Sequence, residues 1–202
     1  MDVAETAAAL RDAQGYEEAL TERTSGMTNM VWGLAAALIF LTYGSAADLI
    51  ERADKTWLYG VLWIPGVLLG TLLTIALWSS HAISLARTMD AKDGWRHLGL
   101  NIVAFLALTA ALAGLLHVLD VAWEPSVLMT LVNGIFALII ATRERSISLA
   151  CSRDTLIAGI WMIGAGIAIG LLGLQHEAAA LAGAAITATG WAGSGLWTFL
   201  RS

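Results

Sequence analysis

Charge, cysteine and proline are all scarce in this chain of 202 residues. Only 13% of the residues are charged, whereas about 25% are charged in a typical soluble domain. The single cysteine, Cys151, excludes an intramolecular disulfide, a thiol redox pair and a cysteine-rich metal cage. The net charge of −5 is unlike the basic surface that nucleic-acid binding requires, so no nucleic-acid partner is predicted.

Motifs of known chemistry are missing as well. The chain has no nucleophile elbow, no phosphate-binding loop and no zinc-protease helix. Its first 27 residues carry acids and no apolar central run, which is unlike a secretory signal peptide. We therefore predict that the protein is not an enzyme and that its first 27 residues are not a signal peptide.

Long apolar segments dominate what is present. Hydrophobic residues make up 58% of the chain, and its mean hydropathy is +0.73. A helix needs about 20 mainly apolar residues to cross the hydrocarbon core, and the alternation of a membrane β-barrel is absent. The sequence predicts an all-α, polytopic integral membrane protein. Its six transmembrane helices are expected at Thr28–Ala47, Trp57–Ser79, Leu98–Leu119, Ser126–Thr142, Thr155–Leu174 and Ala178–Leu200.

The eleven Lys and Arg residues are unevenly divided between the two sides of these spans. Only Arg52 and Lys55 fall in segments on the side away from the N-terminus. The other nine are Arg11, Arg23, Arg87, Lys92, Arg96, Arg143, Arg145, Arg153 and Arg201. Because cytoplasmic loops carry an excess of Lys and Arg, we predict a cell-membrane protein of a prokaryotic inner or plasma membrane, with both termini cytoplasmic.

Two parts are predicted along the chain. Residues 1–26 form a cytoplasmic amphipathic helix, which Asp2 and Glu5 begin as a capping box. Residues 27–202 form the transmembrane bundle, as three consecutive hairpins over residues 28–79, 98–142 and 155–200. The polar face of the first helix is acidic, and an anionic inner leaflet repels such a face. We expect this helix to dock on protein, either the Arg-bearing loops of the chain itself or a partner.

A short internal repeat supports the hairpin organisation. Ile83-Ser84-Leu85-Ala86 follows the second span, and Ile147-Ser148-Leu149-Ala150 follows the fourth. Each continues into a charged turn, Arg87-Thr88-Met89-Asp90 and Cys151-Ser152-Arg153-Asp154, which indicates duplication of a two-span unit. The pattern also predicts that the helices of the second and fourth spans continue past the membrane, to about Met89 and Cys151.

Uncharged polar residues and tryptophans occur within the spans. The polar residues mark one face of each even-numbered span and are candidates for a path across the membrane, although interhelical hydrogen bonding is the commoner role of such residues. These candidates are Thr71, Thr74, Thr130, Asn133, Thr187 and Ser194. Deep tryptophans need a partner for the indole N–H and are expected to pack the bundle. They are Trp32, Trp63, Trp161 and Trp191.

The outer ends of the spans carry an arrangement that resembles a metal site. His117, Asp120 and Glu124 are spaced to share one helical face, and His176 lies in the next outer turn. Imidazole and carboxylate groups suit a divalent transition metal. Pro125 interrupts this face directly after Glu124, and polar residues are ordinary at a membrane boundary, so no metal is predicted. The spans have no lysine for a retinal Schiff base, and no cofactor is predicted.

Small residues at four-residue spacing mark close contacts between helices. Gly66-x-x-x-Gly70 lies in the second span, and Gly166-x-x-x-Gly170 lies in the fifth, where it is expected to face the alanine run of the sixth. Such faces can join helices of one chain or of two copies. We predict contact with membrane lipid, and a homo-oligomer or a membrane-protein partner bound through the Gly/Ala-rich faces and the N-terminal helix.

The sequence favours a non-enzymatic membrane subunit with an auxiliary or scaffold role. The alternative is a small transporter or channel, or the membrane component of a multi-subunit transporter, with a path along the polar faces. Ionisable residues inside the membrane are the usual mark of ion and proton pathways. No Asp, Glu, Lys or Arg lies in the middle of a predicted span, which favours the first hypothesis.

Overall fold

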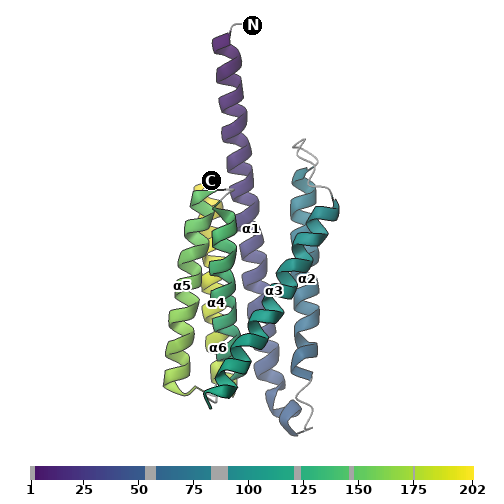
Figure 1. The fold of residues 1–202 in the computed structure, drawn as a ribbon, viewed down its shortest axis with the longest axis vertical. Coiled ribbons are helices and arrows are strands. Elements are labelled where there is room, and N and C mark those ends of the chain that lie inside the picture. The colour runs from purple at the N-terminus through teal and green to yellow at the C-terminus, as the bar shows by residue number, and fades with distance from the viewer. Residues whose placement is uncertain (1–2, 53–57, 83–90, 121–123, 146–147, 175) are drawn as a thin grey trace.

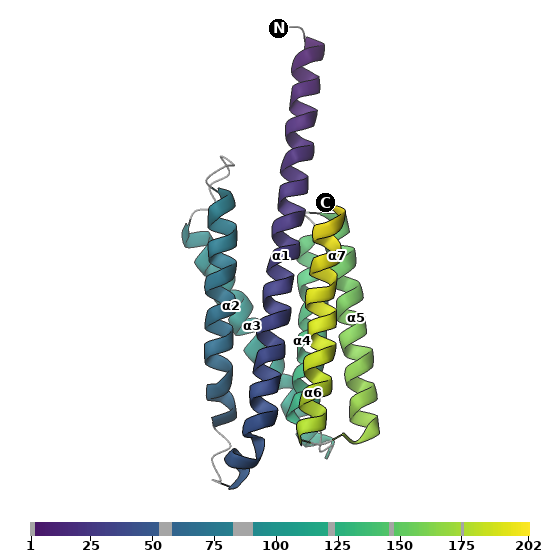
Figure 2. The same ribbon diagram turned by 180° about the vertical axis from the view of Figure 1, so that it is seen from behind.

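A computed structural model describes residues 3–52, 58–82, 91–120, 124–145, 148–174 and 176–202 of the chain. The protein is 95% helical, with no strand among these residues, so the predicted all-α class is confirmed. Most of the helices run along one long axis, and the N-terminal part of the first helix projects beyond the others (Figure 1). The view from behind shows the same arrangement (Figure 2).

Several of the helices are long and apolar enough for a membrane protein. In chain order the elements are α1 (Val3–Arg52), α2 (Leu58–Ala82), α3 (Ala91–Val118), α4 (Pro125–Glu144), α5 (Leu149–Leu172), α6 (His176–Thr187), η1 (Ala188–Ala192) and α7 (Gly193–Arg201). The last three follow one another directly, and η1 is a π-helical turn. Four described segments could cross a bilayer by length and composition, namely Glu5–Ala46, Gly99–Val118, Pro125–Arg143 and Leu149–Leu172. A shorter apolar segment, Pro65–Leu77, lies in α2.

The first helix joins the predicted cytoplasmic helix to the first apolar span without a break. Its 50 residues make a rod of about 75 Å, at 1.5 Å per residue. It contains no proline. The hydroxyls of Thr24 and Thr28 each donate to the carbonyl four residues earlier, at 2.8 Å, so the helix satisfies these polar groups itself. The predicted capping residue Asp2 lies outside the described residues.

Four helical rods form the packed core: α1, α4, α5 and the continuous α6-η1-α7. The main contacts join α4 to α5 and join α1 to α6, η1 and α7, while α2 packs chiefly on α1 and α3 chiefly on α4. Large side chains such as Phe40, Met162 and Trp191 are buried between these rods. The closest packing therefore crosses from one predicted hairpin to another.

The contact between α1 and the C-terminal helix is a contact between backbones. Gly26, Gly33 and Gly44 lie on one face of α1, because intervals of seven and eleven residues are close to whole numbers of turns. A Cβ atom added at Gly26 would lie 2.6 Å from the carbonyl oxygen opposite, and one at Gly44 would lie 2.7 Å from the methyl group opposite. The opposing residues are Gly195, Ala192 and Ala180. Only small residues permit this separation.

The expected contact between Gly166 and the alanine run of the sixth span is wrong. A Cβ atom on Gly166 would meet Leu131 and Thr130 of α4, at 3.0 and 3.4 Å. The reason is that α5 packs most closely on α4, while alanines of the C-terminal helix face α1. Gly66 and Gly70 of α2 also face α1. Gly66, Gly70 and Gly166 therefore join helices within the chain.

The predicted continuation of the fourth span to Cys151 is also wrong. Helix α4 ends at Glu144, and Cys151 belongs to the first turn of α5. Ser148 is the N-cap of α5, since its Oγ accepts from the backbone N–H groups of Ala150 and Cys151 at 3.2 and 3.3 Å. The other copy of the repeat, residues 83–86, lies outside the described residues, as does the predicted extension to Met89. The repeat stays a prediction.

We expect Gly159→Ala in α5 to lower the free energy of unfolding by about 1–3 kcal/mol. The added Cβ would lie 2.9 Å from the carbonyl oxygen of Gly134 in α4, and backbone cannot rotate away. Gly164→Ala in the same helix is the matched control, because nothing lies within 4 Å of its added Cβ. The control should keep or slightly raise stability. Unfolding in mixed micelles, followed by circular dichroism, compares the two; equal stabilities would contradict the close α4–α5 contact.

Candidate functional site

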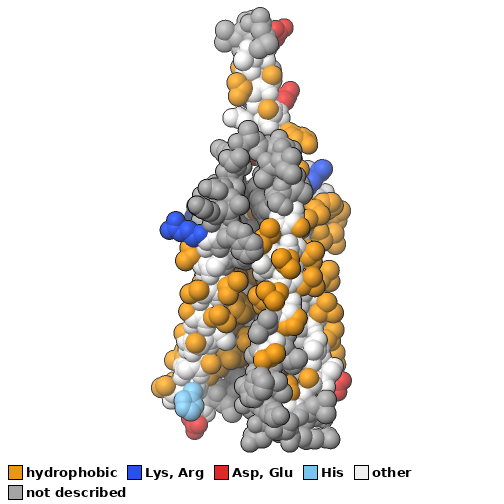
Figure 3. Space-filling model, turned by 90° about the vertical axis from the view of Figure 1, so that its right-hand side faces the viewer, with side chains coloured by type: hydrophobic (Ala, Val, Ile, Leu, Met, Phe, Trp, Pro, Cys, Tyr) orange, Lys and Arg blue, Asp and Glu red, His pale blue; other side chains and the backbone are white. Residues whose placement is uncertain are grey.

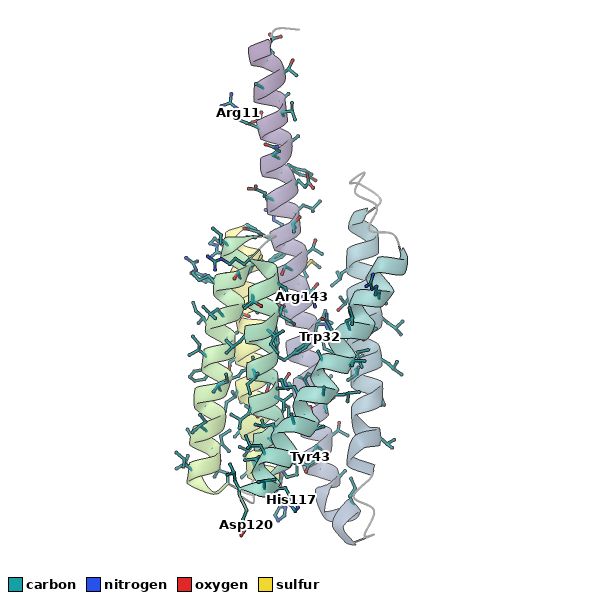
Figure 4. All side chains as sticks on the ribbon, viewed as in Figure 1. Arg11, Trp32, Tyr43, His117, Asp120 and Arg143 are labelled. Carbon is teal, nitrogen blue, oxygen red and sulfur yellow. The ribbon has the colours of Figure 1, made fainter. Side chains whose placement is uncertain are left out.

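The candidates for a metal site lie at the end of the molecule away from the N-terminus. Helix α3 ends at Val118, and Asp120 follows with a left-handed φ of 54°, so the single helical face expected from the spacing does not form. His117 and Asp120 are exposed at this end (Figure 4). Glu124 instead lies near His176, whose Nδ1 is 3.9 Å from the carboxylate. Within the described ranges, no three His, Cys, Asp or Glu side chains are grouped so as to hold a metal ion.

Three of the six polar-path candidates lie apart from the centre of the bundle. Thr71 and Thr74 belong to α2, and Ser194 belongs to α7, with α1 between those helices in both ribbon views. The hydroxyl of Thr74 donates to the carbonyl of Gly70 at 2.8 Å. The hydroxyl of Thr71 is buried and has no hydrogen-bond partner within the part of the chain that is described. The structure does not bring these three side chains together.

The other three candidates lie inside the bundle, on α4 and the C-terminal helix. Thr130 and Thr187 are 0% exposed. Thr130 donates to a carbonyl of its own helix at 2.8 Å, and Asn133 accepts from the indole N–H of Trp191 at 3.4 Å. The hydroxyl of Thr187 has no partner among the described atoms. These side chains take part in helix packing, and their role in a path stays a prediction.

The deep tryptophans differ in their surroundings. Packing inside the bundle is confirmed for Trp191, which is 4% exposed. It is wrong for Trp161, which is 52% exposed and donates to the hydroxyl of Thr189 at 3.0 Å. Trp32 is partly buried and its ring lies over Gly70 of α2. The side chain of Trp63 lies outside the described residues.

A buried carboxylate, not singled out from the sequence, is the centre of a polar cluster near the C-terminus. Asp154 of α5 is 4% exposed. Its Oδ2 accepts from Thr198 Oγ1 and from Arg201 Nη2, both at 2.9 Å. Arg153 Nε lies farther away, 3.5 Å from Oδ1. A carboxylate removed from water needs both an opposite charge and hydrogen bonds, and α7 supplies both to Asp154.

Further polar contacts tie α1 to the same end of the bundle. The amide of Asn29 donates to Thr155 Oγ1 at 3.3 Å, and the hydroxyl of Ser148 donates to the carboxylate of Glu22 at 2.6 Å. The guanidinium of Arg23 donates to the carbonyl of the last residue at 3.1 Å. The acidic Glu22 thus meets the start of α5 through Ser148 rather than through an arginine, while the residues before it project away (Figure 1). The docking of the acidic helix on protein stays a prediction.

The sequence did carry signals for this cluster. Asp154 falls in the predicted charged turn before the fifth span, but the Ser148 N-cap lies six residues before it and places Asp154 within the second turn of α5. Thr198 and Arg201 are three residues apart and therefore share a face at the end of α7. Thr198 supplies a hydroxyl donor and Arg201 a cation on the same face of α7, and α7 packs on α5. This combination indicates an acidic partner on α5.

A groove runs along the outside of the bundle beside Asp154, between α5 and the η1–α7 segment. It is open to the outside of the bundle and has a volume of about 590 Å³. Helix α5 contributes Arg153, Ile157 and Trp161, and the opposite wall contributes Thr189, Ser194 and Trp197. The wall includes η1, and π-helical turns often occur at functional sites. The groove has a charged end and an apolar length, which suits an amphipathic molecule.

The chain matches no protein-family model, no curated protein and no solved structure.

Asp154→Asn should lower the free energy of unfolding by about 2–3 kcal/mol, because the charge of a buried carboxylate that pairs with Arg201 at 2.9 Å is lost. Arg201→Gln acts on the same pair, so the double variant should cost less than the sum of the single variants. Glu18→Gln, at an exposed carboxylate of α1, is the control and should have little effect. Denaturant unfolding of the purified protein in micelles measures all four; strict additivity would show that the pair does not couple.

Proposed function

We propose that this protein is a non-enzymatic membrane subunit, with six spans arranged as consecutive hairpins and both termini in the cytoplasm. It associates with a second copy or with another membrane protein through the projecting part of α1. The observation that carries the proposal is the continuity of α1, which runs from the centre of the packed bundle into a segment that no described part of the chain covers.

The two halves of α1 have opposite surroundings. Phe40 and Tyr43 are buried in the bundle, whereas Leu10 and Tyr16 on the projecting part are 57% and 68% exposed. About 20 residues suffice to cross the hydrocarbon core, so roughly half of this helix lies outside it. Isolated helices are marginal in water, and continuity with a packed helix stabilises this one. Tyrosine is enriched where proteins bind each other, which supports a role for this segment in association.

The surface of α3 supports a bilayer around the bundle. None of the segment Gly99–Val118 is buried inside the protein. Contacts to α4 hold this helix through an edge-to-face pair of Phe105 and Phe136, with centroids 5.3 Å apart, and a hydrogen bond from Arg143 to Asn101. Figure 3 shows hydrophobic side chains over the middle of one face of the bundle, with Lys and Arg above them and acidic and His side chains at the lower end. Such a large apolar surface is unfavourable in water and favourable in lipid.

Helix lengths and charge positions support the finer topology. Helix α2 has 25 residues, and α6-η1-α7 runs from His176 to Arg201, so each is long enough at 1.5 Å per residue to cross a core of about 30 Å. Arg143 lies at the end where α1 projects, and Asp120 lies at the other (Figure 4). A concentration of arginine at the end that holds both termini agrees with the positive-inside rule.

Cysteine labelling tests the topology. In a Cys151→Ala background, a membrane-impermeant maleimide should label Asp120→Cys on intact cells and should label Arg145→Cys only after permeabilisation. Both positions are exposed on the protein, so failure to react reports the membrane rather than burial. Labelling of position 145 from outside would reverse the proposed orientation.

Association is tested with two double variants of the projecting helix. Leu10→Gln with Tyr16→Gln removes exposed apolar anchors, and we expect at least a tenfold weaker complex, since such anchors often contribute more than about 1 kcal/mol each. Arg11→Gln with Asp12→Asn is the matched control, because it leaves the net charge and the apolar residues unchanged. The mass of the assembly extracted from native membranes in mild detergent is the measurement.

A truncation provides an independent check of the same proposal. Removal of residues 1–18 keeps Glu22 and Arg23, which bond to the rest of the bundle, so the remaining chain should stay folded. Its assembly mass should fall to that of the bundle alone. An unchanged mass in both the truncation and the Leu10/Tyr16 variant would show that association, if present, uses another surface.

A further inference from the structure

The groove between α5 and η1–α7 runs from Arg153 at one end to Trp161 at the other. Trp161 Nε1 donates to Thr189 Oγ1 at 3.0 Å, so a hydrogen bond joins the two walls at the Trp161 end. Ala158 and Gly190 line the groove between these ends, and Gly190 lies against Met162, so small residues leave the space open. A volume of about 590 Å³ is within the usual range for binding sites of small molecules.

At the Arg153 end of the groove, the side chains that surround Asp154 carry a surplus of positive charge. Arg201 pairs with Asp154 through a 2.9 Å contact, while the Arg153 contact to the same carboxylate is 3.5 Å. Two guanidinium groups against one carboxylate leave a net charge of +1. The side chain of Arg153 is 62% exposed, so it can still bind an anion from outside the bundle. A planar guanidinium group can donate two parallel hydrogen bonds to two oxygens of one phosphate.

The rise along α5 from one end of the groove to the other is slightly shorter than the hydrocarbon thickness of one bilayer leaflet. Trp161 follows Arg153 by eight residues, which is about 12 Å along the helix. The proposed topology puts Arg153 at the cytoplasmic edge of the hydrocarbon core, so the groove extends about 12 Å inward from the head groups. Ile157 and Ile160 on the same stretch of α5 are 59% and 60% exposed, so described protein does not cover this side of the helix.

We propose that this groove binds one anionic phospholipid of the cytoplasmic leaflet. The phosphate pairs with Arg153, and an acyl chain lies between Trp161 and Trp197 along the small residues of α5 and η1. The proposal rests on the membrane topology given above. A lipid is the occupant because this groove opens to the side where lipid is the solvent, and because the cytoplasmic leaflet supplies anionic head groups at the level of Arg153.

Retention of lipid by the full chain tests the site. The protein is reconstituted into phosphatidylcholine nanodiscs that contain phosphatidylglycerol as the minor component, and native mass spectrometry measures the lipid that stays bound. Arg153→Gln should weaken phosphatidylglycerol retention about fivefold, the effect of one surface charge. Arg145→Gln removes an arginine from the same end of the bundle but outside the groove, and it should have no effect.

A second variant tests the apolar part of the site. Ser194→Phe places a ring in the groove and should reduce retention of both lipids, whatever the head group. Excess inorganic phosphate should not displace the phosphatidylglycerol, since it makes no contact with the tryptophans. Circular dichroism and thermal unfolding confirm that each variant is folded; if Ser194→Phe is not, the comparison of Arg153→Gln with Arg145→Gln decides.

Three results would overturn the proposal: retention unaffected by Arg153→Gln, equal losses in Arg153→Gln and Arg145→Gln, or complete displacement by phosphate. The outcome is separable from that of the proposed function. Arg153→Gln should leave the mass of the protein assembly unchanged, whereas removal of residues 1–18 should change the assembly and leave the bound lipid in place. The labelling of position 145 reports the topology independently of both.

Discussion

Close contact between the backbone of α1 and that of the C-terminal helix is the constraint on which this structure depends. Gly26, Gly33 and Gly44 form one face of α1, and they meet a matching row of small residues on α6, η1 and α7. Lipid tails are as apolar as the side chains, so moving an apolar side chain from lipid into a helix contact gains little free energy. Helix association in lipid therefore relies on van der Waals packing at short distance. The row provides this at three levels along the bundle and joins the two ends of the chain.

The remaining architecture follows from where small residues are available. Helices α4 and α5 form a second close pair around Gly134 and Gly159, and together with α1 and the C-terminal helix they make the core. Among the described residues of α3, Gly99 and Gly114 make no comparable contact, and an aromatic pair and a hydrogen bond join this helix to α4. The molecule therefore has a packed centre and peripheral helices with large apolar surfaces. That division is what a partner or the surrounding lipid would encounter.

Polar residues act mainly at one end of this core. Asp154 accepts from Arg201 and Thr198, and Asn29 donates to Thr155. These contacts join α1, α5 and α7 at the end of the bundle from which α1 projects. These bonds fix the relative positions of helices whose other contacts are apolar and directionless. The same cluster leaves Arg153 at the mouth of a groove. The Asp154–Arg201 pair, which stabilises the bundle, therefore lies next to Arg153, the residue proposed to bind phosphate.

Part of this could be predicted from the sequence, for identifiable reasons. Long uncharged apolar runs can satisfy their backbone hydrogen bonds in lipid only as helices. The helical class could therefore be predicted from the sequence. The start of α5 was missed because Ser148 was assigned to the end of the preceding helix rather than to an N-cap. Asp154 was missed for the same reason, since a residue placed in a turn is expected to be hydrated. The partner of Gly166 was wrong because spacing shows that a face is small but not which helix it meets.

The sequence by itself determined the helical class, the apolar segments and the uneven distribution of arginine, because each depends only on residue type and local spacing. Only the tertiary structure decided that α5 packs on α4, that Asp154 is buried against Arg201, and that Trp161 faces a groove while Trp191 is buried. These depend on contacts between residues far apart in the chain. No local pattern records which of several similar apolar faces will meet.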